Sequence, residues 1–155
     1  MNNSQYPSQE PLVNVEYSGF WLRLLALIID IVVLNIILFI LIILISVGLT
    51  VISDIIVMPK LPLEIIGQFL VFAFYWLYFT VSESSVWQAT IGKNAMGMVV
   101  TDIYGNRISF LQANIRYWSK ILSTIFMIGF IMAAFTEKKQ GLHDMIAGTL
   151  VVKVY

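Results

Sequence analysis

The 155-residue sequence has no cysteine and a single histidine, His143. Without cysteine the chain forms no disulfide framework and no thiolate nucleophile, and a single histidine excludes a zinc site built from several histidines. We therefore expect no metal and no cofactor. Charged residues are also scarce, at 12% of the chain against about 25% in soluble domains. Nine basic and nine acidic residues cancel, which argues against binding of nucleic acid.

Apolar sequence is abundant: 59% of the residues are hydrophobic, and the mean hydropathy is +0.88. The longest run is Leu24–Ile45, in which 19 of 22 residues are Leu, Ile, Val or Phe. A helix of that length spans about 33 Å, enough to cross the hydrocarbon core of a bilayer. We predict transmembrane helices over about 19–53 and 65–81, joined by a short polar loop. The fold class is a mainly α-helical integral membrane protein.

The chain divides into two unequal parts. Residues 1–16 are polar, with two prolines, and predict a disordered tail. Residues 17–155 form the predicted membrane domain, which Tyr17, Phe20 and Trp21 introduce as aromatics of the kind found at membrane interfaces. We expect a multi-pass membrane protein with its amino terminus in the cytoplasm.

Asp30 and Arg23 are the charged residues of the first predicted helix. An acid within a membrane helix costs about 2.5–3.5 kcal/mol and is by default a candidate functional residue, although polar contacts between helices are the structural alternative. Seven residues place the two backbones about 10 Å apart, too far for an intrahelical ion pair. Asp30 is therefore expected to contact another part of the chain or another subunit. Arg116 and Lys120 are the candidate cations.

Two short segments have the composition of β-strands. Val- and Thr-rich sequence around 96–102, followed by Tyr104-Gly105-Asn106-Arg107, predicts a β-hairpin over about 96–110 at the membrane surface. The closing segment 142–153 ends in a strand-like run from Gly148 to Lys153. These segments predict a small surface structure beside the membrane helices.

The third hydrophobic segment, about 118–135, has two interpretations. A complete crossing would divide the basic residues five to four between the two sides of the membrane, whereas a re-entrant segment would divide them eight to one, with Lys60 alone outside. The preference for basic residues on the cytoplasmic side favours re-entry, and the length of about 27 Å permits a crossing. Re-entry would also bring the strand at 148–153 beside the predicted hairpin.

With these residues in place, the chain resembles the RDD family of small bacterial membrane proteins. That family is named for an arginine opening the first helix, an aspartate within it and a second aspartate near the carboxyl end, and Arg23, Asp30 and Asp144 match these positions. The stretches Thr90–Val100 and Leu142–Val152 resemble the family's loop and closing motif. Ile91 and His143 depart from it, standing where proline and glycine are common. The resemblance implies a location in the bacterial inner membrane and a role in transport, with sodium–proton exchange in some members.

Two hypotheses of function follow. In the first, Asp30 carries a proton or monovalent cation through a homo-oligomer, with Asp144 as a second ligand and Asn35, Ser123 and Thr124 as further oxygen donors. In the second, the charged set is structural, with Arg116, Lys120 and His143 in support, and the protein is an accessory or scaffold for another membrane protein or for lipid. We expect no enzyme, because no nucleophile stands at a catalytic spacing from His143.

Overall fold

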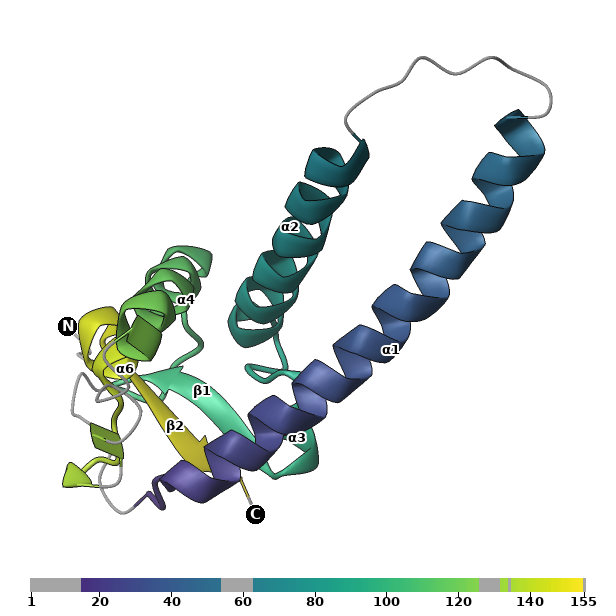
Figure 1. Cartoon of the computed structure of the whole chain (residues 1–155). Coiled ribbons are helices and arrows are strands. Elements are labelled where there is room, and N and C mark those ends of the chain that lie inside the picture. Colours follow the sequence, from purple (N-terminus) through teal and green to yellow (C-terminus); the bar gives the residue numbers. More distant parts are fainter. Residues whose placement is uncertain (1–14, 54–62, 126–131, 134, 155) are drawn as a thin grey trace, which may run out of the picture.

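A computed structural model describes residues 15–53, 63–125, 132–133 and 135–154. Two long helices, α1 (Phe20–Ser53) and α2 (Leu63–Ser84), extend from a group of shorter elements (Figure 1). We call this group the head, and it consists of α3 (Ile91–Ala95), β1 (Met98–Asp102), α4 (Phe110–Ile125), α6 (Leu142–Ala147) and β2 (Thr149–Lys153). The predicted tail lies outside the described residues, except for Val15 and Glu16.

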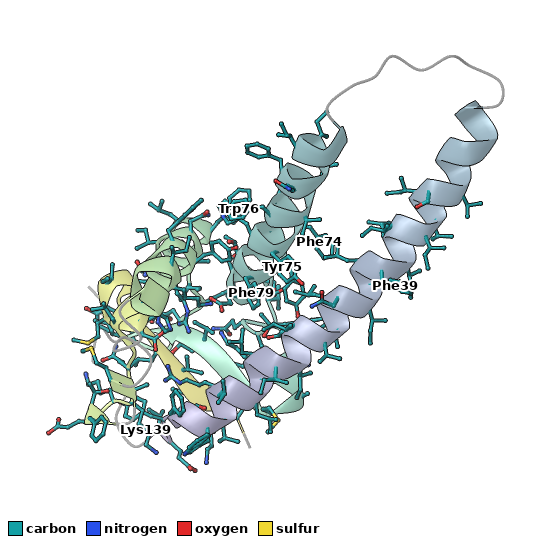
Figure 2. All side chains as sticks on the ribbon, in the orientation of Figure 1. Phe39, Phe74, Tyr75, Trp76, Phe79 and Lys139 are labelled. Atoms are coloured by element: carbon teal, nitrogen blue, oxygen red, sulfur yellow. The ribbon has the colours of Figure 1, made fainter. Side chains whose placement is uncertain are left out.

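The two long helices confirm the two predicted apolar helices. Residues Phe20–Gly48 and Ile65–Ser84 are long and apolar enough to cross a membrane. Large apolar side chains cover their outer parts: Phe39 is 65% exposed and Phe69 is 71% exposed, and Figure 2 shows Phe39 pointing away from α1 into open space. Apolar surface on this scale requires a nonaqueous environment, and lipid supplies it.

β1 and β2 form a two-stranded antiparallel sheet in which Val100 lies opposite Val151. The residues that precede α1 lie along the other side of β2. The Ser18 amide donates to the Val151 carbonyl at 2.9 Å, and the Lys153 amide donates to the Glu16 carbonyl at 2.9 Å. The start of α1 is therefore attached to the end of the chain through the backbone.

The expected hairpin over 96–110 is wrong in its second strand. β1 forms as predicted, but the segment after it contributes an isolated bridge between Thr101 and Arg107. Ser109 then caps the N-terminus of α4: its hydroxyl accepts from the Gln112 amide at 3.2 Å, and Gln112 Oε1 accepts from the Ser109 amide at 2.9 Å. This capping box commits the residues after Ile108 to a helix. The ladder partner of β1 is the C-terminal strand.

The pairing of β1 with β2 also bears on the third hydrophobic segment. One complete crossing by 118–135 would leave the two strands on opposite sides of the membrane, where they could not be hydrogen-bonded neighbours. The strand pairing therefore supports the re-entrant interpretation, which stays a prediction. The predicted segment itself lies partly outside the described residues, at 126–131 and 134. Its described beginning belongs to α4, which buries Arg116, Ser119 and Ser123.

Candidate functional site

Asp30 is buried where α1 meets the first turn of α3, and it is 1% exposed. Its Oδ1 accepts hydrogen bonds from the Tyr78 hydroxyl and the Gly92 amide, each at 2.7 Å, and its Oδ2 accepts from the Thr90 hydroxyl at 2.6 Å. The Tyr78 hydroxyl in turn accepts from the Ile91 amide at 3.0 Å. A negative charge at a helix N-terminus is favourable because it satisfies amides that have no partner within the helix. The hydrogen bonds of Asp30 thus hold α3 against α1.

Gly92 permits this contact because it has no side chain. A Cβ atom at this position would lie 2.0 Å from the Ala26 carbonyl oxygen and 2.9 Å from Asp30 Cγ. Ala26 is itself small and buried. Two small residues on facing helices therefore allow the close approach that brings the Asp30 carboxylate within reach of the α3 backbone.

Asp144 lies in the first turn of α6 and is fully buried. It forms an ion pair with Arg23 from α1, and its Oδ1 lies 2.9 Å from Nη2 of Arg116 on α4. Its Oδ2 also accepts from the Gly141 amide at 3.1 Å, and His143 Nε2 lies 3.2 Å from Oδ1. One carboxylate therefore holds three helices of the protein together.

Glu83, the penultimate residue of α2, is the centre of a second cluster and is 1% exposed. Lys93 Nζ lies 2.6 Å and Lys120 Nζ 3.0 Å from its Oε1, and Arg116 Nε lies 3.1 Å from its Oε2. Arg116 is shared between the two clusters, because its guanidinium also contacts Asp144. It donates as well to the Thr149 hydroxyl at 2.9 Å.

Burial and neighbouring charge shift three pKa values in the head. Burial raises the pKa of Asp144, but Arg116 and Arg23 outweigh it and hold that pKa well below its usual range. Burial lowers the pKa of His143 to about 3, which keeps the imidazole neutral despite Asp144. Burial, with Arg116 and Lys120, lowers the pKa of Lys93 to about 7 against the opposing effect of Glu83.

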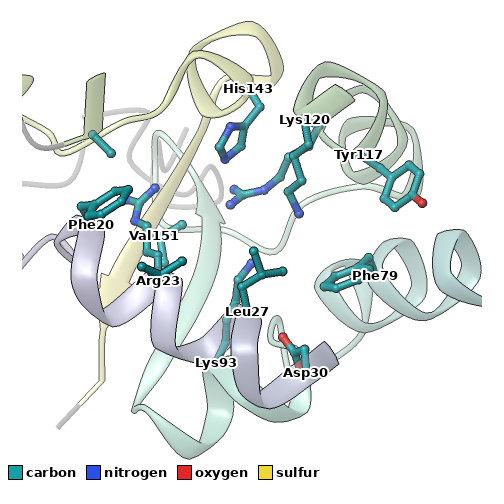
Figure 3. A pocket seen from close by; sticks show the side chains of 13 residues that line it. Phe20, Arg23, Leu27, Asp30, Phe79, Lys93, Tyr117, Lys120, His143 and Val151 are labelled. Atoms are coloured by element: carbon teal, nitrogen blue, oxygen red, sulfur yellow. The ribbon is translucent and has the colours of Figure 1, made fainter. Parts of the chain in front are cut away.

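A cavity of about 450 Å³ opens between these elements. Leu24, Leu27 and Phe79 form apolar parts of its wall, and Asp30 reaches it from α1. In Figure 3, Arg23 points into this space from α1, Lys120 from α4 and His143 from α6. The cavity is therefore lined mostly by apolar surface, with the cations Arg23 and Lys120 and the neutral imidazole of His143 along its polar part.

The structure brings some predicted site residues together and separates others. Arg23 and Asp144, 121 positions apart, are ion-paired. Asp30 belongs to a different set of contacts, and the expectation that Arg116 or Lys120 supplies its cation is wrong: their carboxylate partners are Glu83 and Asp144. Asp30 instead receives hydroxyl and backbone donors, which its position at the start of α3 provides.

The further oxygen ligands suggested for Asp30 do not assemble around it. Asn35 is exposed, and its amide donates to the Ile31 carbonyl of the same helix at 2.7 Å. The Thr124 side chain lies outside the described residues, and Ser123 is buried within α4. In the described part of the chain, no three His, Asp or Glu side chains are grouped as a metal site would require.

Glu83 is the functional residue that sequence reasoning missed. The second apolar helix is predicted to end at about residue 81, which leaves Glu83 outside it. The sequence did contain a signal for Glu83: it is an acid at the end of an apolar span. Lys93, Arg116 and Lys120 also lie near predicted membrane interfaces and are possible partners. Pairing these cations with one carboxylate required knowing that α2, α3 and α4 meet.

The two long apolar helices and the buried charge clusters beside them define the class as a membrane protein with a polar head. The model of the RDD family matches residues 17–148, and the chain belongs to this family. It is 36% identical to the uncharacterized protein YxaI of Bacillus subtilis (strain 168), covering 87% of this chain and 96% of YxaI. It is 29% identical to the uncharacterized membrane protein YteJ of the same organism, covering 97% and 90%. No solved structure matches.

Proposed function

We propose that this protein is a non-transporting accessory or scaffold protein of the bacterial cytoplasmic membrane, in which Arg23, Asp30 and Asp144 are structural. The observation that carries the proposal is that both aspartates are already engaged. Asp30 accepts three hydrogen bonds from the protein, and Asp144 contacts two arginines and a backbone amide. A hard cation requires several oxygen ligands, so binding one would displace these donors.

In this role the head is cytoplasmic and the long helices make contacts in the plane of the membrane. The partner is another copy of the chain or a different membrane protein, and no catalysis takes place. The many basic residues on the head support a cytoplasmic position. The exposed apolar surface of α1 and α2 supports contacts within the bilayer.

Sodium–proton exchange through a homo-oligomer is a second candidate function. One observation favours it: Asp30 reaches the cavity, and its hydrogen-bond donors are neutral hydroxyls and a backbone amide. A buried carboxylate in such surroundings can exchange a proton for a cation, as acids in membrane exchangers do.

Proteoliposomes distinguish the two functions. We expect wild-type protein to produce no proton flux above that of protein-free liposomes under sodium, potassium or lithium gradients. We also expect Asp30→Asn to lower thermal stability, because its amide would face the donors that now bind the carboxylate. Asn35→Leu, an exposed polar position on the same helix, is the matched control and should change neither property. Wild-type flux that disappears in a normally folded Asp30→Asn protein would establish exchange instead.

Cysteine labelling tests the orientation, because the native chain has no cysteine. We expect an impermeant thiol reagent to label Lys60→Cys in intact cells and to label Lys139→Cys only after permeabilisation. Equal labelling of both from outside would contradict the re-entrant third segment and the cytoplasmic head.

A further inference from the structure

The cavity between α1, α2 and the head has the size of a small-molecule site and an uneven distribution of charge. Its volume of about 450 Å³ lies in the range of ligand sites. Four cations line it: Arg23, Lys93, Arg116 and Lys120. Asp30 is the one carboxylate among its lining residues in the described part of the chain. Most of the cavity surface is apolar, and the charged side chains along it are mainly cationic.

The carboxylates near these side chains do not balance the cations. Glu83 and Asp144 form ion pairs with the four basic side chains. With Asp30 they make three carboxylates against four basic groups, of which Lys93, with its lowered pKa of about 7, is partly protonated at neutral pH. Arg23 Nη2 is buried without a hydrogen-bond acceptor among the described residues. A buried positive charge without a full complement of acceptors is costly. An anion in the cavity would supply the missing charge and an acceptor.

The position of the four cations relative to the ends of the two long helices indicates what kind of anion fits. Arg23 is the fourth residue of α1. The other three cations form ion pairs with Glu83, which is the penultimate residue of α2. The charges therefore lie where both apolar helices enter the head, at the level of a membrane interface. The exposed Trp21, next to them in the sequence, is typical of that level.

The apolar wall of the cavity complements the cationic one. Leu24 and Leu27 come from α1 and Phe79 from α2, the two long apolar helices. Lys120 Nζ lies over the Phe79 ring, 5.2 Å from its centre, so cationic and apolar side chains meet along the cavity. A ligand that fills both walls has an anionic group and an apolar part.

We propose that this cavity binds an anionic phospholipid, with its phosphate against Arg23, Lys93 and Lys120 and its first acyl carbons against Leu24, Leu27 and Phe79. Phosphatidylglycerol carries one net negative charge and offsets the excess. Phosphatidylcholine carries its own cation and does not. Inorganic phosphate shares the anionic chemistry but leaves the apolar wall uncovered. The site exists whether the protein is a scaffold or an exchanger.

Native mass spectrometry of the full-length protein, titrated with phosphatidylglycerol or phosphatidylcholine of identical acyl chains, tests this site. We expect wild type to bind one phosphatidylglycerol at least about tenfold more tightly than phosphatidylcholine, the ratio expected for one charge-assisted hydrogen bond. Lys120→Gln should reduce the affinity for phosphatidylglycerol by about tenfold, while Glu83 keeps Lys93 and Arg116. Lys138→Gln, the same change at an exposed lysine of the chain, should leave it unchanged.

A second variant keeps every charge in place. Leu27→Trp fills the apolar part of the cavity and should exclude the lipid while the far-ultraviolet circular dichroism spectrum stays the same. This variant decides the outcome if Lys120→Gln does not fold. Equal binding of both lipids, or full binding by Leu27→Trp, would overturn the proposal. So would loss of phosphatidylglycerol to millimolar inorganic phosphate, which would assign a free-anion site instead.

Discussion

The two halves of α1 contain similar apolar residues but have opposite surroundings. In the half near the head, Ala26, Asp30 and Leu34 are spaced by four and are each at most 1% exposed, forming one buried stripe. In the outer half, none of the described side chains from 39 to 48 is buried, and Leu44 is 64% exposed. Protein covers one stripe of the first half, whereas the described side chains of the second half face lipid. Hydropathy identifies both halves as membrane helix. Only the half near the head contains buried small and polar residues, Ala26 and Asp30, that contact other elements of the protein.

The largest effect should come from removing the carboxylate that joins α1 to the head. Asp144→Asn leaves Arg23 and Arg116 buried with reduced compensation, and breaking a buried ion pair in this way costs about 3–5 kcal/mol. Chemical unfolding in detergent, followed by circular dichroism, measures the loss. Glu137→Gln, an exposed acid, is the control. A loss below about 1 kcal/mol for Asp144→Asn would show that the pair does not hold the head.

The same substitution in each half of α1 tests the comparison directly. Leu34→Ala removes a side chain that is 0% exposed, and creating such a cavity costs about 2–5 kcal/mol. Leu44→Ala removes a lipid-facing side chain and should change the free energy of unfolding by less than about 0.5 kcal/mol. Unfolding of the two variants in the same lipid mixture provides the measurement. Equal effects would mean that protein also covers the outer half.

The close approach of α3 to α1 predicts a smaller loss. Gly92→Ala would place a methyl group against the carbonyl oxygen and carbon of Ala26, which are backbone atoms and cannot turn away as a flexible side chain would. Overpacking of this kind costs about 1–3 kcal/mol. Gly67→Ala, in α2, meets nothing within 4 Å and should be neutral or slightly stabilising. Thermal unfolding of the purified variants measures the difference. A neutral Gly92→Ala would contradict the contact that positions Asp30.

The smallest effect concerns pH and the neutral imidazole of His143. Burial lowers its pKa to about 3 in the folded state, whereas the unfolded value is about 6.5. Between these values the unfolded chain binds the extra proton, so stability falls as the pH is lowered through this window. From pH 7 to 5 the loss should be up to about 2 kcal/mol, and His143→Gln should reduce it. An unchanged slope in that variant would assign the pH dependence to another group.

Most of the helical architecture could be predicted from the sequence, because long apolar runs determine membrane helices locally. The strand at 149–153 also followed from local composition. The second strand of the predicted hairpin was wrong, because a Val- and Thr-rich strand such as β1 can pair with any strand of suitable register. The capping box at Ser109 and Gln112 was a local signal that could have excluded a second strand there.

The candidate site was predicted as residues but not as contacts. Arg23, Asp30 and Asp144 were identified together, yet the structure divides them between two clusters joined to different elements. Glu83 and Gly92 become important only when α2 and α3 are placed against their neighbours. A charged residue in a sequence shows that a partner is needed, but many residues of opposite charge satisfy that need equally well.

The sequence by itself determined two apolar helices, a chain poor in metal ligands, and the arginine and two aspartates of the family. Tertiary structure alone decided that Arg23 meets Asp144, that Asp30 caps α3, and that four cations face one cavity. The physical reason is one of range. Hydropathy and helix formation depend on neighbours along the chain, whereas an ion pair depends on the distance between side chains that the whole fold brings together.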